Sequence, residues 1–299
     1  MKKSVLQKVL SAVVISLGAI ASSLPAQAGT IISGWNYARD DYSYDGSGPS
    51  GFNADSRWDI YGVGFKTVGN EIWVGINSSN SINGVTYNNN NVGFGDLFLD
   101  FNNPVSGSSF QAAQGSLVGV RFAPNADGIG TTPLGVYTNV TGKSVAGNNS
   151  GYPNLKDYND RAKSATGSDS RFGDLLWSNP YYAPYTSGSP SLPNVIDSGT
   201  RFNNGNVRNL SSLELADSLF PTQINLTSSN PNTFGFAFTL PDSYKGKQFL
   251  ATLGFDCSND TVSVRPVPVP PAIAGILAAG ALGGLRAVRR KKQNKAVEA

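Results

Sequence analysis

The chain has 299 residues, with 23 Lys and Arg, 20 Asp and Glu, and a formal net charge of +3 at pH 7. It contains one cysteine and no histidine, which excludes an intrachain disulfide, histidine-dependent catalysis and His-ligated metal sites. Nine basic residues and one acidic residue lie before residue 29 or after residue 265, so the chain between holds 14 basic and 19 acidic residues, a net charge of −5. That part lacks the basic excess of a nucleic-acid-binding protein, and we expect no nucleic-acid partner.

Residues 1–28 have the three regions of a secretory signal peptide. Three lysines come first, residues 9–20 form a short apolar run, and Ala26 and Ala28 are the small residues that a signal peptidase accepts. We expect cleavage before Gly29 by signal peptidase. An uncleaved membrane anchor would also begin this way, but the apolar run is short for one.

The first half of the exported part alternates apolar and polar residues, with the period of two that is typical of strands. Residues 57–67 and 71–77 are expected to form a hairpin around a turn at 68–70, and the Asn-rich residues 77–91 an exposed loop. Further short strands are expected at residues 94–101, 116–122 and 134–140.

Residues 152–206 are rich in Pro, Ser, Asn, Gly and Tyr and show little periodicity, so we interpret them as a long loop. Tyr181, Tyr182 and Tyr185 lie at its centre. Tyrosines in such a loop suit stacking against sugars, but half-buried packing is the more common reason for them and is the interpretation that we favour.

One short helix is expected at residues 211–220, because Ser211 and Glu214 have the spacing of a capping box, Leu215 and Leu219 share a face, and Pro221 follows as a stop. Residues 234–240 and 249–255 alternate aromatic and small residues and are expected to pair as a hairpin. The pattern predicts an all-β fold, an antiparallel β-sandwich with a jelly roll as one form it can take, over residues 29–264.

Two groups of carboxylates are candidate sites. Asp40, Asp41 and Asp45 could bind Ca²⁺, which takes several oxygen ligands at once, although a solvated loop gives the same pattern. The acidic residues in strongly apolar context are Asp96, Asp100 and Asp174. These would have to face one another across a cleft to act as a glycosidase pair, whereas hydrogen bonding at turns and edges is the far more common role of an aspartate after glycine. The lone Cys257 is interpreted as a small half-buried residue.

The C-terminal 35 residues have three parts: a proline-rich hinge at 265–271, an apolar segment at 272–288 expected to be a transmembrane helix, and a basic tail at 289–299. The basic cluster consists of Arg286, Arg289, Arg290, Lys291 and Lys292. Basic residues stay on the cytoplasmic side of a membrane, so the preceding domain would face outward. The apolar run from 272 to 285 is shorter than the roughly 20 residues that span a bilayer comfortably, which favours a processing signal over an ordinary tail anchor.

This tripartite tail resembles the PEP-CTERM sorting signal of bacterial exosortase substrates, in which a short motif, usually Val-Pro-Glu-Pro, precedes a transmembrane helix and an arginine-rich end. Val267, Pro268, Val269 and Pro270 match the motif at three of four positions, with Val269 in place of Glu. Residues 38–41 are also similar to an x-Asp-Asp signature of cyanobacterial exosortase-dependent surface proteins, and the Cys-Ser-Asn-Asp sequence at 257–260 is similar to one found before the hinge in such substrates.

The resemblance implies an exported, non-enzymatic surface or matrix protein that is held briefly by its C-terminal helix and processed by an exosortase-like enzyme. Extracellular polysaccharide is the partner that this location suggests, and no cofactor is expected apart from a candidate Ca²⁺ ion. Two further functions fit the sequence: a lectin-like carbohydrate-binding module, with or without calcium, and a glycoside hydrolase.

Overall fold

A computed structural model describes residues 30–40, 45–46, 57–102, 107–127, 133–188, 191–221 and 232–265. The expected signal peptide, the hinge after Arg265 with its sorting motif, the apolar segment and the basic tail lie outside these residues. Within them, no helix combines the length and the apolar character that crossing a membrane would take.

The described strands form two six-stranded antiparallel sheets and two small two-stranded ribbons. The first sheet consists, in spatial order, of β1 (Thr30–Ile32), β2 (Trp35–Arg39), β3 (Ile60–Val68), β4 (Glu71–Ser78), β14 (Asn232–Phe238) and β13 (Val207–Asn209). The second consists of β12 (Val195–Arg201), β9 (Gly135–Lys143), β8 (Leu117–Arg121), β7 (Leu97–Asp100), β15 (Leu250–Gly254) and β16 (Thr261–Val264). The ribbons pair β5 (Val85–Tyr87) with β6 (Asn90–Val92) and β10 (Arg171–Phe172) with β11 (Leu175–Leu176).

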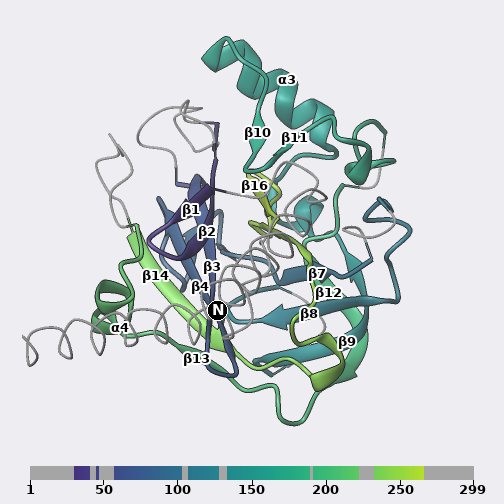
Figure 1. Ribbon diagram of the computed structural model, residues 1–299. Helices are drawn as coiled ribbons and strands as arrows, with labels where there is room; N and C mark the ends of the chain where they lie inside the picture. The colour runs from purple at the N-terminus through teal and green to yellow at the C-terminus, as the bar shows by residue number, and fades with distance from the viewer. Residues whose placement is uncertain are drawn as a thin grey trace, which may run out of the picture.

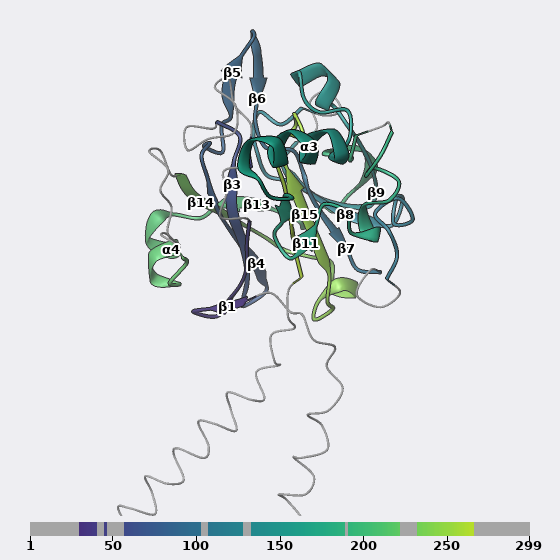
Figure 2. The same cartoon turned by 90° about the horizontal axis from the view of Figure 1, so that it is seen from above.

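The two sheets pack face to face, as Figures 1 and 2 show, and the main hydrophobic core lies between them. Phe236 of β14 stacks on Phe122, which follows β8, with ring centroids 4.1 Å apart and planes at 8°. Phe94 adds an edge contact to Phe234 and a tilted contact to Phe255. Since these rings come from both sheets and pack in one core, the all-β prediction is confirmed and the described layers form a sandwich.

A second, smaller core covers the outer face of the first sheet. The ring of Phe220 lies 4.8 Å from Trp35 and packs above Gly75, where an added Cβ would lie 2.3 Å from the Phe220 ring. Glycines that alternate with apolar residues along β3 and β4 therefore make room for aromatic rings on one face. The expected β3–β4 hairpin forms, with Val68 opposite Glu71.

The expected hairpin between residues 234–240 and 249–255 is wrong. β14 pairs with β4 and β13 in the first sheet, whereas β15 pairs with β7 and β16 in the second. The connection crosses from one layer to the other and contains the 3₁₀ turn η3 (Asp242–Tyr244). The predicted alternation is present, because both strands turn their apolar faces to the core, but those faces meet across the sandwich.

The prediction of one helix and of a long loop at 152–206 is also wrong. This segment contains the helix α3 (Leu155–Thr166), the ribbon β10–β11 and the strand β12. The side chain of Asn154 caps α3 by accepting a hydrogen bond from the Asp157 N–H, and Gly167 ends it in the left-handed conformation. Only one narrow face of α3 is buried, so its sequence lacks a broad apolar stripe.

The helix α4 (Ser212–Asp217) confirms the predicted capping box of Ser211 and Glu214. It is shorter than expected and ends before Leu219, which has a φ of 57° and is 65% exposed. Phe220, 4% exposed, provides the buried contact in its place.

The Asn-rich segment, expected to be a loop, contains the β5–β6 ribbon, with Asn88 and Asn89 exposed at its turn.

Candidate functional site

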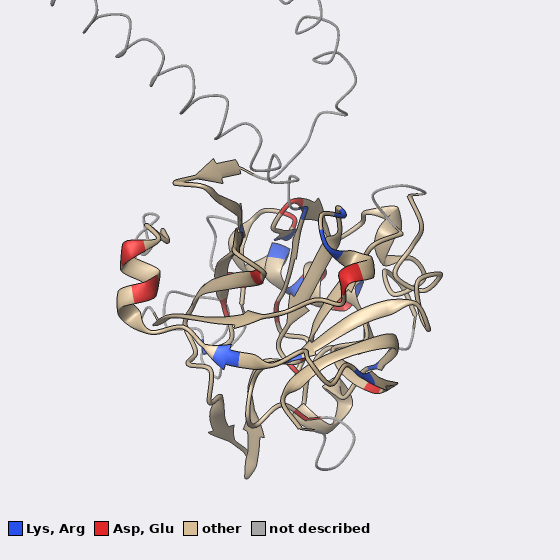
Figure 3. Ribbon diagram, turned by 60° about the horizontal axis from the view of Figure 1, so that its bottom comes forward, with Lys and Arg blue, Asp and Glu red and all other residues tan. Residues whose placement is uncertain are grey.

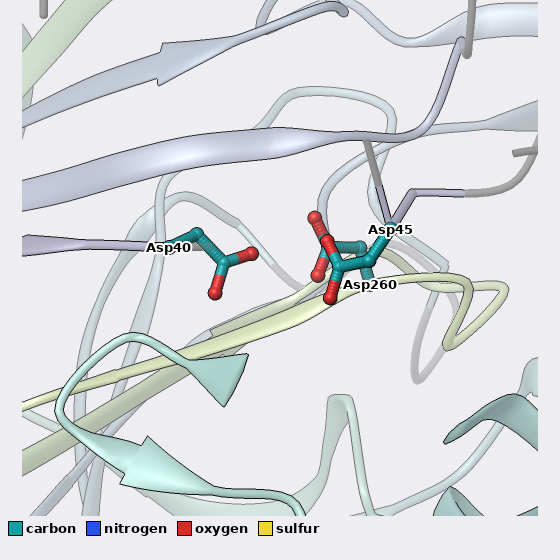
Figure 4. Close-up of side chains that lie close together, drawn as sticks. All are labelled: Asp40, Asp45 and Asp260. Atoms are coloured by element: carbon teal, nitrogen blue, oxygen red, sulfur yellow. The ribbon is translucent and has the colours of Figure 1, made fainter. Parts of the chain in front are cut away.

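Three buried aspartates meet at one end of the sandwich. One carboxylate oxygen from each of Asp40, Asp45 and Asp260 lies within 4.8 Å of the others, and the three residues are 3%, 1% and 1% exposed. Figure 4 shows the three carboxyl groups turned toward one another, from the end of β2, from the segment that follows it and from the turn before β16. Residues 40 and 260 are thus brought together from opposite ends of the described chain.

Backbone N–H groups hold two of these carboxylates. The Asp260 Oδ2 accepts from the Ile60 N–H at 2.5 Å, and its Oδ1 accepts from the Thr261 N–H at 2.6 Å. The Asp40 Oδ1 accepts from the Gly173 N–H at 3.0 Å. These bonds join β2, β3, β16 and the β10–β11 ribbon around the cluster, because each strand begins or ends there.

The helix α3 covers the cluster. The hydroxyl of Tyr158, which is 1% exposed, donates to the carbonyl oxygen of Asp45 at 2.7 Å. Burial raises the pKa of Tyr158 well above its ordinary value, and the negative charges of Asp45, Asp260, Asp40 and Asp59 raise it further. Tyr158 is therefore a neutral donor, and a fourth aspartate, Asp59, contributes to the negative potential around it.

The three carboxylates bring negative charge together at a buried site. Carboxylates that share a buried site repel one another, and the repulsion is relieved by protonation, by donors or by a cation. Oxygens from three carboxylates are ligands of the kind that Ca²⁺ prefers, which takes six to eight of them at about 2.3–2.6 Å. Because the three residues are almost inaccessible, a cation there would join strands and would not contact a ligand at the surface.

The structure brings together part of the predicted metal site. Asp40 and Asp45 meet, Asp41 lies outside the described residues, and Asp260 is a member that the sequence does not reveal. The contribution of Asp260 depends on where β16 lies against β2 and β3, a contact between segments about 200 residues apart in the chain. The only local signal at this position is the Cys-Ser-Asn-Asp sequence of the turn before β16, which by itself does not indicate a metal ligand.

The three aspartates considered for a glycosidase each accept a hydrogen bond from the backbone. The Asp96 Oδ2 accepts from the Ile196 N–H at 2.6 Å, the Asp100 Oδ1 from the Asn102 N–H at 2.8 Å, and the Asp174 Oδ2 from the Arg265 N–H at 2.8 Å. Asp96 is fully buried, and burial raises its pKa to about 7. Burial also raises the pKa of Asp174. The Asp96 and Asp174 contacts join segments far apart in the chain, and the Asp100 contact fixes the turn that follows β7, so each carboxylate has a structural role.

The central tyrosines of residues 152–206 are part of another buried cluster, separate from the main core and from the core around Phe220. Tyr181, Tyr182 and Tyr185 are 3%, 0% and 3% exposed, and the Tyr182 hydroxyl donates to the Ser263 Oγ at 2.7 Å. These buried side chains agree with the packing interpretation and present no platform for a sugar.

Cys257 is fully buried, so it is less exposed than expected. Burial raises the pKa of its thiol well above the ordinary value, so the thiol is neutral.

Comparison of the chain with protein-family models, with curated proteins and with solved structures finds no match.

Proposed function

We propose that the chain is an exported surface or matrix protein with a structural, polysaccharide-associated role. The observation that carries the proposal is the position of the fold in the sequence. The first strand, β1, begins at Thr30 and the last, β16, ends at Val264, so the sandwich lies between the expected signal peptide and the proline-rich hinge. A leader, a folded part, a hinge, an apolar run and a basic end then follow one another without overlap.

The two ends of the described chain lie at the same edge of the sandwich, which supports attachment through a single side. β1 is the outer strand of the first sheet and β16 is the outer strand of the second. β16 also contacts β2 and β3, so the last strand packs beside the first ones. A chain held by its C-terminal segment would leave the rest of the sandwich facing outward.

Export of this fold does not depend on oxidative folding. The single cysteine is buried and makes no disulfide, while the described core contains twelve large side chains with less than 2% exposure. Burying a large side chain contributes about 1.5–3 kcal/mol. The packed aromatic core therefore supplies the stability that disulfides give many smaller secreted domains.

Processing by an exosortase-like enzyme is the mode of sorting that we propose, on the resemblance of residues 265–299 to PEP-CTERM tails. The test replaces Arg289, Arg290, Lys291 and Lys292 with Ser and follows the protein in the cell. The wild-type protein should lose its tail and reach the surface or the medium, whereas the variant should keep its tail. A wild-type protein that keeps its tail and stays in the inner membrane would refute the proposal.

A structural Ca²⁺ ion at Asp40, Asp45 and Asp260 is a second proposal, favoured by the convergence of three buried carboxylates. The cation would stabilise the fold by RT ln(1 + [Ca²⁺]/Kd), about 2.7 kcal/mol at a hundredfold excess over Kd. The melting temperature should rise with CaCl₂ and fall with a chelator, and Asp45→Asn should abolish that difference. Equal melting temperatures of the wild type in CaCl₂ and chelator, with no calorimetric binding of Ca²⁺, would contradict a calcium site.

A calcium-assisted lectin and a glycoside hydrolase receive less support from the geometry. The lectin needs its ion at the surface, whereas the aspartate cluster is buried beneath α3. The hydrolase needs two carboxylates facing a substrate, whereas Asp96, Asp100 and Asp174 each bind a backbone N–H. Loss of hydrolysis on Asp→Asn substitution at any of them would favour the enzyme.

A further inference from the structure

Three described hollows of the surface lie at the end of the sandwich opposite the aspartate cluster. Tyr244 lines all three hollows, Lys247 lines the first two, and Lys245 lines the first. The volumes of the hollows are about 300, 660 and 560 Å³. The first lies beside the β3–β4 turn, at the Val68 end of β3, while Asp260 binds Ile60 at the other end. A strand of nine residues is about 30 Å long, so the two sites are far apart.

The residues lining these hollows carry one sign of charge. Among the described lining residues, Lys66, Lys245, Lys247 and Arg201 are cationic and none is Asp or Glu. Charged positions are otherwise scattered over the described ribbon in both signs (Figure 3), and the chain between its two ends has a net charge of −5. The exposed Asp242 lies between the lining residues Pro241 and Ser243, so the surface is mainly cationic, a local feature that attracts anions.

The cationic side chains that line the hollows differ in their contacts. The Lys66 Nζ donates to the Ser218 carbonyl at 3.0 Å and lies 5.8 Å from the Trp35 ring centroid. The Lys247 Nζ lies 5.7 Å from the Tyr244 ring centroid. Lys245 forms an ion pair with the exposed Asp242 at 2.7 Å, which offsets part of its charge. The first two contacts place the Lys66 ammonium on the outer face of the first sheet, beside Trp35, so it faces away from the hollows. Lys247 and Arg201 have no ion pair among the described residues, so their charges remain available to a ligand.

Aromatic rings and amides lie beside these charges. Phe101 and Tyr244 are both half-buried, with ring centroids 4.6 Å apart, and Phe249 packs below them at 5.3 Å from Phe101. Half-exposed rings of this kind present an apolar face to the apolar face of a sugar. The side chains of Asn102 and Asn139 line the same hollows and can both donate and accept hydrogen bonds, as sugar hydroxyls require.

We propose that the three hollows around Tyr244 form a binding surface for an anionic polysaccharide chain, with successive sugars against adjacent hollows and their acidic groups near Lys247 and Arg201. Adjacent hollows favour a linear polymer over a single lipid headgroup, because each further sugar bound on the same chain adds affinity at a high effective concentration. The proposal names the ligand class of the proposed polysaccharide-associated role and rests on that role for the presence of the ligand.

The test measures binding of the full-length protein, in a neutral detergent, to an oligogalacturonate, to dextran sulfate and to uncharged dextran. Both anionic polymers should bind, with affinity that falls as salt increases, and dextran should not. Stronger binding of one anionic polymer supports the proposal and identifies carboxylate or sulfate as the recognised group. Equal binding of dextran would overturn the anionic class.

Two double variants separate a specific surface from general charge. Lys247→Gln with Arg201→Gln should weaken binding about tenfold or more, which corresponds to about 1.4 kcal/mol. Lys156→Gln with Arg161→Gln removes the same charge from α3, which covers the aspartate cluster, and should leave binding unchanged. Circular dichroism confirms that both variants fold. Equal losses in the two variants, or stronger binding to anionic phospholipid vesicles than to either polymer, would overturn the proposal.

Different results would contradict the proposed sorting and the proposed binding surface. A protein that is processed and reaches the surface but binds neither anionic polymer contradicts only the binding surface. A protein that binds through Lys247 and Arg201 but keeps its tail in the inner membrane contradicts only the proposed sorting.

Discussion

Asp96 illustrates how a buried carboxyl group contributes to this fold. It is fully buried where β7 meets the start of β12, and its Oδ2 accepts from the Ile196 N–H. Burial raises its pKa to about 7, with the Ile196 hydrogen bond and the charge of Arg121 acting in the opposite direction. Asp256 behaves alike, with burial raising its pKa to about 8.

These raised pKa values predict a pH-dependent stability. Between the ordinary aspartate pKa of 3.8 and about 7, the folded state holds a proton at Asp96 that the unfolded state has released. The free energy of unfolding should therefore fall as pH rises from about 4 to about 8, by up to about 1.4 kcal/mol per pH unit for each such group. Melting temperatures over this range test the direction.

Asp96→Asn keeps an oxygen acceptor for the Ile196 N–H and removes the titrating group, so its stability should fall less steeply with pH than that of the wild type. Part of the slope should remain because of Asp256. Asp197→Asn, at an exposed position, serves as the control and should keep the wild-type slope. A wild-type protein whose melting temperature rises steadily over this range would contradict the raised pKa values.

At the scale of the elements, the strands and helices show what the sequence can and cannot predict. Strand alternation depends on neighbours two residues apart, so β3, β4, β8, β9, β14 and β15 lie near their expected positions. Pairing depends on the whole chain, and the expected hairpin of residues 234–255 is wrong because a core-facing strand has the same pattern in either sheet. The helix α3 is not evident in the sequence because its buried face is polar in part, with Asn159 at 1% exposure.

The candidate sites, like the strands, depend partly on local sequence and partly on tertiary structure. The local density of aspartates predicts the pairing of Asp40 with Asp45, but Asp260 joins them through tertiary structure alone. The cationic hollows around Tyr244 combine residues from β3, from β9 and from the β14–β15 connection, and no local motif marks them. Single lysines scattered in a sequence give no sign that they share a surface.

The capping box of α4 gives a test at this scale. Ser211→Ala removes the acceptor of the Glu214 N–H and should destabilise the protein by about 1 kcal/mol, a fall of about 2–4 °C in melting temperature. Phe220, which follows α4, packs on Trp35, so loss of the cap should also loosen this outer core. Leu213→Ala, at a position 72% exposed, should change the melting temperature little. Equal effects of the two substitutions would show that the cap contributes nothing.

At the scale of the whole molecule, the sandwich separates two features along its strands. The buried aspartates join β2, β3 and β16 at one end, and the cationic hollows lie around Tyr244 at the other. The aspartate cluster suits a role in stability, because it is inaccessible. The hollows suit a role in binding, because they are open to solvent. Both would serve the protein that we propose, which is exported, released from its membrane segment and retained by an acidic polysaccharide.

The intact mass of the protein recovered from the cell surface and the medium tests the proposed export and processing together. We predict a mass that begins at Gly29 and ends within residues 265–271, without the apolar segment and the basic tail. A mass that extends to Ala299, found only in the inner-membrane fraction, would contradict the proposal.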